Sequence, residues 1–357
     1  MIPGEVWHRS RAPVASHDTL EQALQIHWGL TATLTPLYGE RDLNVRLDTP
    51  GGETWLLKLA HPDTGRRRLD FEQAVLDGLD TRRASPAAPT LVPSRDGESL
   101  VPITLDGAVR THLRLLSWLP GEPLDPERAG PETLEALGSA IARLNEALAA
   151  CAPRDTRALP DALPWDLRNT ADLAPLLDAC PPLVPAEAIR RTLEAFRRNV
   201  EPALRALPAQ VIHNDLNPDN LRCDPGRPGA APGVIDFGDM VVAPVVCDLA
   251  IACAYLVGRA PDTCLDRVVA VLRGFDRVRS IREAEWALLP ILLECRLCQS
   301  LLIQGARVGD GHPDAEALET NLEGHGRRLL ALQALGRDRA GWLKAAVISR
   351  TSGNLNG

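Results

Sequence analysis

Residues 211–224 read VIHNDLNPDNLRCD, and they place one His, three Asp and three Asn directly after an apolar pair. Neither a buried strand nor an ordinary surface loop requires carboxylates and amides at this density. Side chains of these types bind metal ions, contact phosphates or exchange protons. The stretch therefore marks the part of the chain where we expect chemistry.

The spacing in and after this stretch is specific. Asp215 follows His213 by two positions, Asn220 follows Asp215 by five, and a second apolar run, GVID, leads into D-F-G at 236–238. Phosphoryl transfer requires one carboxylate that faces the acceptor hydroxyl, and an amide and a second carboxylate that hold Mg²⁺ on the phosphates. We therefore predict Asp215 as the catalytic residue and Asn220 and Asp236 as metal ligands, placed side by side by a hairpin.

The first part of the chain supplies complementary residues. Lys58 lies in the otherwise apolar run WLLKLA, where a Lys is costly unless it is paired. Glu72 follows in a helix-like segment, and a strand Lys that pairs with a helix Glu and reaches the α- and β-phosphates is the kinase arrangement. The tip YGERDLN is expected to cover the phosphates through backbone N–H groups from Gly39 onward, assisted by Arg41. It is not a G-x-G-x-x-G loop.

Residues 1–116 are predicted to form a small, mostly antiparallel sheet with helical segments against it. A helix capped by Asp18 opens this part, and a later helix carries Glu72. The runs with strand character are 31–37, 43–49, 54–60, 99–105 and 108–119. This pattern makes residues 1–116 an N-lobe.

Residues 117–124 are predicted to be a hinge, whose backbone at Ser117 and Leu119 contacts a purine edge. Residues 125–357 are predicted to be a mainly helical C-lobe, with Asp248 bracing a loop at the start of one helix. The helical stretches lie at 131–150 and near 165–179, 185–206, 244–257, 281–307 and 313–335. Short strands near 209–212, 221–223 and 233–236 flank the polar loop, so the predicted fold class is α+β.

Composition limits the class of protein. The 357 residues include 39 Lys plus Arg and 47 Asp plus Glu, a net charge of −8, which disfavours nucleic-acid binding. The start of the chain has no apolar signal segment, and the apolar run 245–257 is too short to span a bilayer. Cys295 and Cys298 form a C-x-x-C without a second pair, so we predict that both are core thiols. We also predict a cytoplasmic protein with reduced thiols that does not bind membranes.

The chain resembles the aminoglycoside phosphotransferase/choline kinase-like family over roughly residues 20–335. The segments GERDLNVRL, WLLKLA, VIHNDLNPDNL, GVIDFGDM and CDLAIACAYL carry the resemblance, and they are most similar to its hydroxylysine kinase-like branch. The resemblance implies a bilobal protein-kinase-like fold, ATP or GTP with Mg²⁺, and a His213 that holds the loop. It also implies phosphorylation of a hydroxyl on a small, often amine-bearing molecule or amino acid.

Several functions remain open at this stage. Asp248 follows Asp236 by only twelve positions and no A-P-E occurs, so a peptide-docking segment has no room and a small acceptor is favoured. A hydroxylysine-like acceptor comes first, and an aminoglycoside, homoserine, choline or ethanolamine kinase is the alternative. A non-catalytic nucleotide-binding protein has no need of Lys58, Asp215, Asn220 and Asp236 together. A metal hydrolase leaves Lys58 unexplained.

Overall fold

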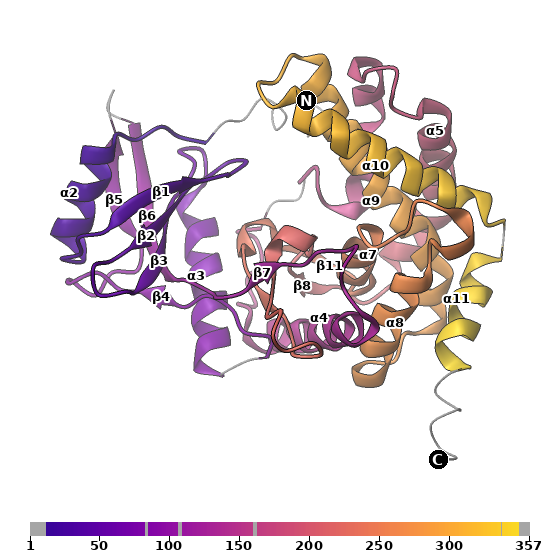
Figure 1. The fold of residues 1–357 in the computed structure, drawn as a ribbon, viewed down its shortest axis with the longest axis horizontal. Coiled ribbons are helices and arrows are strands. Elements are labelled where there is room, and N and C mark those ends of the chain that lie inside the picture. The colour runs from indigo at the N-terminus through magenta and orange to yellow at the C-terminus, as the bar shows by residue number, and fades with distance from the viewer. Residues whose placement is uncertain (1–11, 83–84, 106–108, 160–162, 337, 350–357) are drawn as a thin grey trace. The chain divides into compact units, whose positions relative to one another are not determined.

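The computed structural model describes residues 12–82, 85–105, 109–159, 163–336 and 338–349. They fall into two compact units. The described residues up to Pro120, with Ala150–Leu159, form the N-terminal unit. Gly121–Ala149 and the described residues from 163 onward form the C-terminal unit (Figure 1). An antiparallel sheet dominates the first unit and helices dominate the second, which confirms the predicted α+β, protein-kinase-like class.

The N-terminal unit is built on an antiparallel sheet of six strands in the order β1-β2-β3-β6-β4, with β5 also paired to β6. Its elements are α2 (His17–His27), β1 (Thr33–Leu37), β2 (Leu43–Asp48), β3 (Thr54–Leu59), α3 (Arg66–Thr81), β4 (Leu91–Val92), β5 (Val101–Leu105) and β6 (Val109–Ser117). Ser16, not the predicted Asp18, caps α2, because its hydroxyl accepts the N–H of Thr19 while Asp18 already lies in the first turn.

Alternation along the strands decides which side chains reach the candidate site. One face of the sheet packs on α2 in a core that includes Leu20, Leu24, Val45, Leu47, Leu57, Leu59, Leu113 and Leu115. Lys58 and Arg114 lie between these leucines, so the two side chains point to the opposite face. Helix α3 lies on that second side of the sheet (Figure 1).

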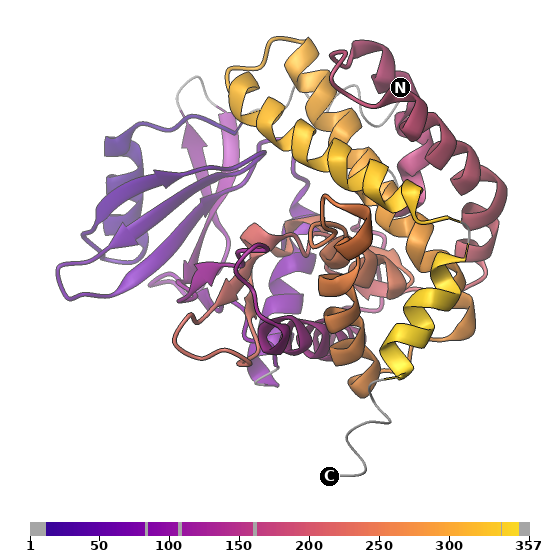
Figure 2. The ribbon, with the colours of Figure 1, turned by 45° about the vertical axis from the view of Figure 1, so that its right-hand side comes forward.

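The C-terminal unit surrounds one long helix, α9 (Glu283–Gly309). Its other elements are β7 (Glu122–Pro123), α4 (Pro131–Cys151), η2 (Leu167–Ala179), α5 (Ala186–Ala195), η3 (Phe196–Val200), α6 (Glu201–Arg205), β8 (Gln210–Ile212), η4 (Pro218–Asn220), β9 (Leu221–Cys223), β10 (Gly233–Val234), η5 (Phe237–Asp239), β11 (Val241–Ala243), α7 (Val246–Ala254), η6 (Pro261–Thr263), α8 (Asp266–Val278), α10 (Ala315–Ala334) and α11 (Arg339–Ile348). Helix α10 runs alongside α9 (Figure 2). Strand β9 lies between β7 and β10, and β11 pairs with β8.

Helix α9 is the core of this unit. It is long and apolar enough to cross a membrane by length and composition, yet 89% of its most apolar window is buried inside the protein. Cys295 and Cys298 are fully buried free thiols on this helix, and burial raises the pKa of both. The prediction that they are core residues is confirmed.

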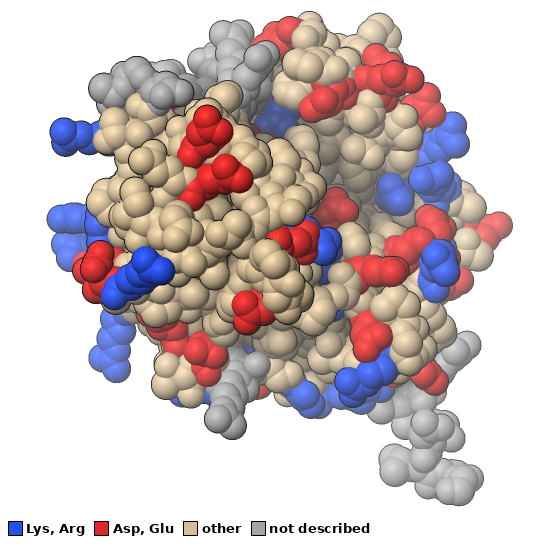
Figure 3. Space-filling model, turned by 60° about the vertical axis from the view of Figure 1, so that its left-hand side comes forward, with Lys and Arg blue, Asp and Glu red and all other residues tan. Residues whose placement is uncertain are grey.

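Charged side chains of both signs are scattered over one face of the protein (Figure 3). On the face shown in Figure 3, Lys and Arg are interspersed with Asp and Glu over the described residues. This mixture agrees with the modest net charge of −8.

Candidate active site

The polar loop after β8 is anchored by a buried carboxylate. Asp248 of α7 is 0% exposed, and its two oxygens accept the backbone N–H groups of His213 at 3.0 Å and Asn214 at 2.7 Å. Asn145 of α4 donates a third hydrogen bond to Asp248 at 3.2 Å. Burial raises the pKa of Asp248, while His213 and the N–H donors act in the opposite direction. These contacts confirm the predicted bracing role.

His213 joins the loop to the D-F-G segment. Its Nδ1 accepts the backbone N–H of Asp215 at 3.3 Å, so Nε2 carries the proton and donates it to the Ile235 carbonyl at 3.1 Å. The ring also packs edge-on against Phe237, with centroids 4.7 Å apart. His213 therefore holds the loop, as the family resemblance implied.

Asp215 lies in this loop with both carboxylate oxygens held. Oδ1 accepts from Nη2 of Arg296 at 2.7 Å. Oδ2 accepts from the side-chain amides of Asn217 at 3.0 Å and Asn220 at 2.8 Å. These hydrogen bonds fix the direction of the carboxylate. The side chain is 19% exposed, so a ligand can still reach it.

Asn220 and Asp236 are brought together by the short β9–β10 hairpin. The register pairs Leu221 with Val234, and the carbonyl of Asn220 accepts the N–H of Ile235 at 3.0 Å, which confirms the predicted hairpin. Asp236 follows in the left-handed region, with φ of 62°, where the chain turns out of the strand. Since Nδ2 of Asn220 donates inward to Asp215, the amide oxygen of Asn220 faces away from that hydrogen bond.

A second charged cluster lies on the α3 side of the N-terminal sheet. The strand register places Lys58 of β3 opposite Arg114 of β6. Oδ2 of Asp42 lies 3.5 Å from Nζ of Lys58 and 3.6 Å from Nη2 of Arg114, so it bridges the two cations. Oδ1 of Asp42 accepts the backbone N–H of His61 at 2.9 Å, which fixes the carboxylate in the loop before β2.

The predicted Lys58–Glu72 ion pair is wrong. Nη1 of Arg114 donates to Oε2 of Glu72 at 2.6 Å, and Nε of Arg68 lies 3.4 Å from Oε1. Arg114 enters the same face as Lys58 and carries a longer, forked donor, so it takes the carboxylate of Glu72. Glu72 is 4% exposed and so is held inside the unit.

The turn from β1 to β2 is tight where Gly39 stands. A Cβ at Gly39 would lie 2.1 Å from the carbonyl oxygen of Asp42, so no other residue fits this turn without movement. Arg41 is half-buried in the same turn. The pKa of His61 is lowered first by the burial of His61 and next by the charge of Arg41. A glycine-tight turn with a nearby guanidinium fits the predicted phosphate-covering loop in shape and charge.

The backbone N–H of Ser117 is already bonded within the N-terminal unit. It donates to the carbonyl of Thr90 at 2.9 Å, and Oγ of Ser117 accepts the N–H of Thr90 at 2.9 Å. A purine contact at Ser117 therefore needs its carbonyl rather than its N–H. Leu119 is half-buried in the coil after β6. The boundary between the two units, after Pro120, falls inside the predicted hinge 117–124.

Three side chains of the candidate site escaped sequence reasoning: Asp42, Arg114 and Arg296. Arg114 and Arg296 each interrupt an apolar run, HLRLL in a strand and LLECRLCQSLL in a helix. A charge in such a run is costly unless it is paired, the same signal that identified Lys58. Asp42 lies in a polar turn, where an acidic residue is ordinary and gives no signal.

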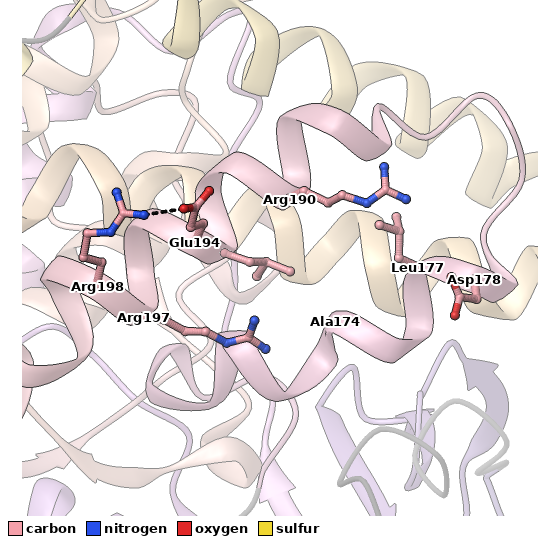
Figure 4. Close-up of a pocket in the computed structure, with 8 residues that line it drawn as sticks. Ala174, Leu177, Asp178, Arg190, Glu194, Arg197 and Arg198 are labelled. Carbon is pink, nitrogen blue, oxygen red and sulfur yellow. Dashed lines mark hydrogen bonds and ion pairs between the residues drawn. The ribbon is translucent and has the colours of Figure 1, made fainter.

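A surface pocket of about 480 Å³ lies elsewhere in the C-terminal unit, between η2 and the α5–η3 segment. Figure 4 shows Arg190 and Arg197 extended along it, while Arg198 turns to pair with Glu194. Its lining comes from residues 174–198 and includes none of the predicted site residues.

The arrangement in the C-terminal unit is a fixed carboxylate in a loop, next to an amide–carboxylate pair on a hairpin. The model of the phosphotransferase enzyme family matches residues 33–281, more than half of the chain, and the match includes Lys58, Glu72, Asp215, Asn220 and Asp236. The chain belongs to the phosphotransferase enzyme family. As a member of this family it is an enzyme that transfers a phosphoryl group.

Curated relatives of this phosphotransferase carry the names of small-molecule kinases. Hydroxylysine kinase of Danio rerio is 27% identical over 354 residues, covering 94% of this chain and 96% of that protein. Homoserine kinase of Granulibacter bethesdensis is 29% identical over 263 residues, covering 72% and 75%.

Solved structures share the fold of this phosphotransferase. A microcompartment-associated aminopropanol kinase is 20% identical with a TM-score of 0.63, covering 93% of this chain and 99% of that one. Amicoumacin kinase in complex with AMP-PNP, Ca²⁺ and Ami is 14% identical with a TM-score of 0.68, covering 92% and 97%.

Proposed function

We propose that this phosphotransferase is a Mg²⁺-dependent kinase that moves the γ-phosphoryl group of ATP or GTP to a hydroxyl of a small, amine-bearing molecule, with hydroxylysine-like amino acids first. The observation that carries the proposal is the β9–β10 hairpin, which sets Asn220 next to the D-F-G turn while Asp215 is held in the preceding loop. A phosphoryl-transfer site needs these three groups at close range.

The residues of the hairpin fit Mg²⁺. This ion prefers hard oxygen ligands, and here an amide oxygen before β9 and a carboxylate after β10 come together at the open end of the hairpin. Asn220 is the better defined ligand, because the hydrogen bond from its Nδ2 to Asp215 orients the amide with the oxygen facing the other way. When bound, the ion neutralises the negative charge of the phosphates.

Asp215 is proposed to orient the acceptor. Its carboxylate accepts the hydroxyl hydrogen of the acceptor, points the oxygen at the phosphorus and takes the proton as the new P–O bond forms. The hydrogen bonds from Arg296, Asn217 and Asn220 hold the carboxylate for this task, so little reorganisation is needed at the moment of transfer.

The N-terminal unit is proposed to hold the nucleotide phosphates. Lys58 supplies the cation, and Asp42 keeps that cation in place at 3.5 Å. Backbone N–H groups from Gly39 onward, with Arg41, cover the phosphates. Leu119 remains the proposed backbone contact for the purine, and Glu72 acts indirectly by balancing the charge of Arg114.

The acceptor class rests on the relatives. The hydroxylysine kinase of Danio rerio matches almost the whole of this chain, whereas the homoserine kinase of Granulibacter bethesdensis matches 72% of it. A hydroxylated amino acid is common to both names, and this places homoserine ahead of aminoglycosides, choline and ethanolamine as the second candidate. We also propose a cytoplasmic location, because all eight cysteines are free thiols.

The test is release of nucleoside diphosphate over a panel of hydroxylysine, homoserine, amino alcohols, choline, ethanolamine and aminoglycosides, each with ATP and with GTP. We expect Mg²⁺-dependent release with a small amine-bearing alcohol and loss of release on chelation by EDTA. Background release with every acceptor, or a peptide as the best acceptor, would contradict the proposal.

A further inference from the structure

Among the described residues, Arg296 is the largest of the almost completely buried side chains, at 1% exposure in the middle of α9. A buried guanidinium is unfavourable unless its charge is balanced and its N–H groups are bonded. The partner that balances it is Asp215, whose Oδ1 lies 2.7 Å from Nη2. The chain therefore places a buried cation directly against the proposed catalytic carboxylate.

The guanidinium is fixed on several sides. Nε donates to the hydroxyl of Tyr255 at 3.0 Å, and Nη1 donates to the carbonyl of Trp165 at 3.1 Å. The rings of the same two residues lie against it, with the guanidinium carbon 4.7 Å from the Trp165 centroid and 5.7 Å from the Tyr255 centroid. These contacts hold the guanidinium of Arg296 in one position. The guanidinium can therefore fix the position of the group that it binds.

The hydrogen bonds divide the two oxygens of Asp215 into different roles. A carboxylate offers about two lone-pair positions on each oxygen. Oδ2 accepts from both Asn217 and Asn220, so its two positions are taken. Among the described residues, Oδ1 accepts from Arg296 alone, so one of its positions is left.

We propose that Arg296 is a positioning residue that holds the Asp215 carboxylate with Oδ1 turned to receive the acceptor hydroxyl. The inference rests on the proposed function, because it takes Asp215 as the group that orients the acceptor. It adds that the orientation is imposed from α9, by a residue that does not itself touch the acceptor.

The experiment compares Arg296→Ala, Asp215→Asn and the double variant, with hydroxylysine, ATP and Mg²⁺. Arg296→Ala is expected to lower kcat by roughly 100-fold and to leave the KM for ATP within about twofold, because the nucleotide residues are untouched. Guanidinium ion, at concentrations that leave the fold intact, is expected to restore kcat in part by entering the space between Trp165 and Tyr255. Urea at the same concentration should not.

The double variant separates positioning from general support of the fold. Because Arg296 is proposed to act through Asp215, adding Arg296→Ala to Asp215→Asn should lower kcat by less than about threefold more. Arg307→Ala is the matched control, since Arg307 is also buried in α9 but does not contact Asp215, and it should retain kcat. If Arg296→Ala does not fold, Tyr255→Phe takes its place in the test. This variant removes only the hydroxyl that accepts from Nε of Arg296, and it should lower kcat several-fold.

Wild-type kcat in folded Arg296→Ala would overturn the inference. It would also be overturned if the decrease in kcat of the double variant equals the product of the decreases in Arg296→Ala and Asp215→Asn. Wild-type kcat in Tyr255→Phe, where Arg296→Ala does not fold, would overturn it as well. If Asp215→Asn keeps full turnover, or wild type does not phosphorylate hydroxylysine, the proposed function fails instead. The two failures therefore give different results.

Discussion

Arg114 and Glu72 form a buried ion pair, with Nη1 of Arg114 2.6 Å from Oε2 of Glu72. The pair holds the helix carboxylate on Arg114, while Asp42 lies beside Lys58 at 3.5 Å. In a single Lys–Glu pair, one carboxylate both orients the Lys and balances the buried charge. Here these two tasks are divided between two carboxylates. Asp42 orients the cation, and Glu72 balances the second cation on the same face of the sheet.

This division predicts different defects for two conservative variants. Asp42→Asn should raise the KM for ATP roughly tenfold, equivalent to about 1.4 kcal/mol, because the carboxylate 3.5 Å from Nζ of Lys58 is lost. Glu72→Gln should mainly lower the free energy of unfolding, by about 3 kcal/mol, because Arg114 keeps a buried charge without its closest partner. Steady-state kinetics and urea unfolding of both variants check this. The reverse assignment of the two defects would contradict it.

Lys58→Ala should lose nucleotide use more than stability. The variant leaves the Asp42 carboxylate with Arg114 as its remaining described cation, at 3.6 Å, so a loss of about 1–3 kcal/mol in unfolding free energy is expected. Turnover should fall far more than this destabilisation explains. The turnover of the variant is measured on protein that circular dichroism shows to be folded. Wild-type turnover in that protein would show that Lys58 does not contribute to the site.

Asn214 should tolerate glycine better than alanine. Its backbone is left-handed, with φ of 67°, and neither polar atom of its buried side chain has a hydrogen-bond partner. Asn214→Gly removes that unsatisfied amide and keeps the conformation, so its unfolding free energy should stay within about 1 kcal/mol of wild type. Asn214→Ala keeps the Cβ that the left-handed region disfavours, and it should be about 1 kcal/mol less stable than Asn214→Gly. Chemical unfolding of the two variants gives the order, and a more stable alanine variant would contradict it.

His325 should make the fold sensitive to acid. Burial, followed by the charges of Arg328, Arg296 and Arg259, lowers its pKa to about 3. The unfolded chain binds this proton near pH 6.5, so it holds more protons than the folded chain between pH 6.5 and 3, and stability falls as pH falls through this window. His325→Phe keeps a ring beside Tyr255 and removes the titration.

Unfolding curves of wild type and His325→Phe between pH 7.5 and 4.5 measure the effect as a difference, in which shared carboxylates cancel. Wild type should lose about 2–3 kcal/mol more than the variant over this range. Parallel pH dependence of the two proteins would show that His325 titrates alike in both states.

The fold was predictable where a periodic pattern extends over enough residues. Alternating leucines predicted the long sheet strands, and the Pro- and Gly-rich segment between β9 and β10 predicted the hairpin. Strands β4, β7 and β11 were not predicted, because two or three residues carry no period and these strands, unlike β8, β9 and β10, do not flank the polar loop and its hairpin. Helix α8 was also missed: it has a helical period, but its Val-rich run and Gly274 lower helix propensity.

The site was predictable where its residues are close in sequence. His213, Asp215, Asn220 and Asp236 lie within one loop and one hairpin, so their spacing alone indicates the chemistry. The partner of Asp215 is 81 positions away, in α9. Only the folded chain shows which buried charges meet over such separations, and the misassigned partner of Glu72, 42 positions on, has the same cause.

The central claim is that the two aspartates have different tasks, and one titration tests it most directly. Calorimetric titration of Mg²⁺–ATP into Asp215→Asn, Asp236→Asn and Asn220→Ala is to be paired with single-turnover rates for each variant. Asp215→Asn should bind Mg²⁺–ATP nearly as wild type while turnover falls roughly 10²–10⁴-fold, the scale of a lost acid–base group. Asp236→Asn, and Asn220→Ala to a similar degree, should lose the Mg²⁺ dependence of ATP binding itself. Loss of Mg²⁺–ATP binding in Asp215→Asn, with binding retained in Asp236→Asn, would contradict the account.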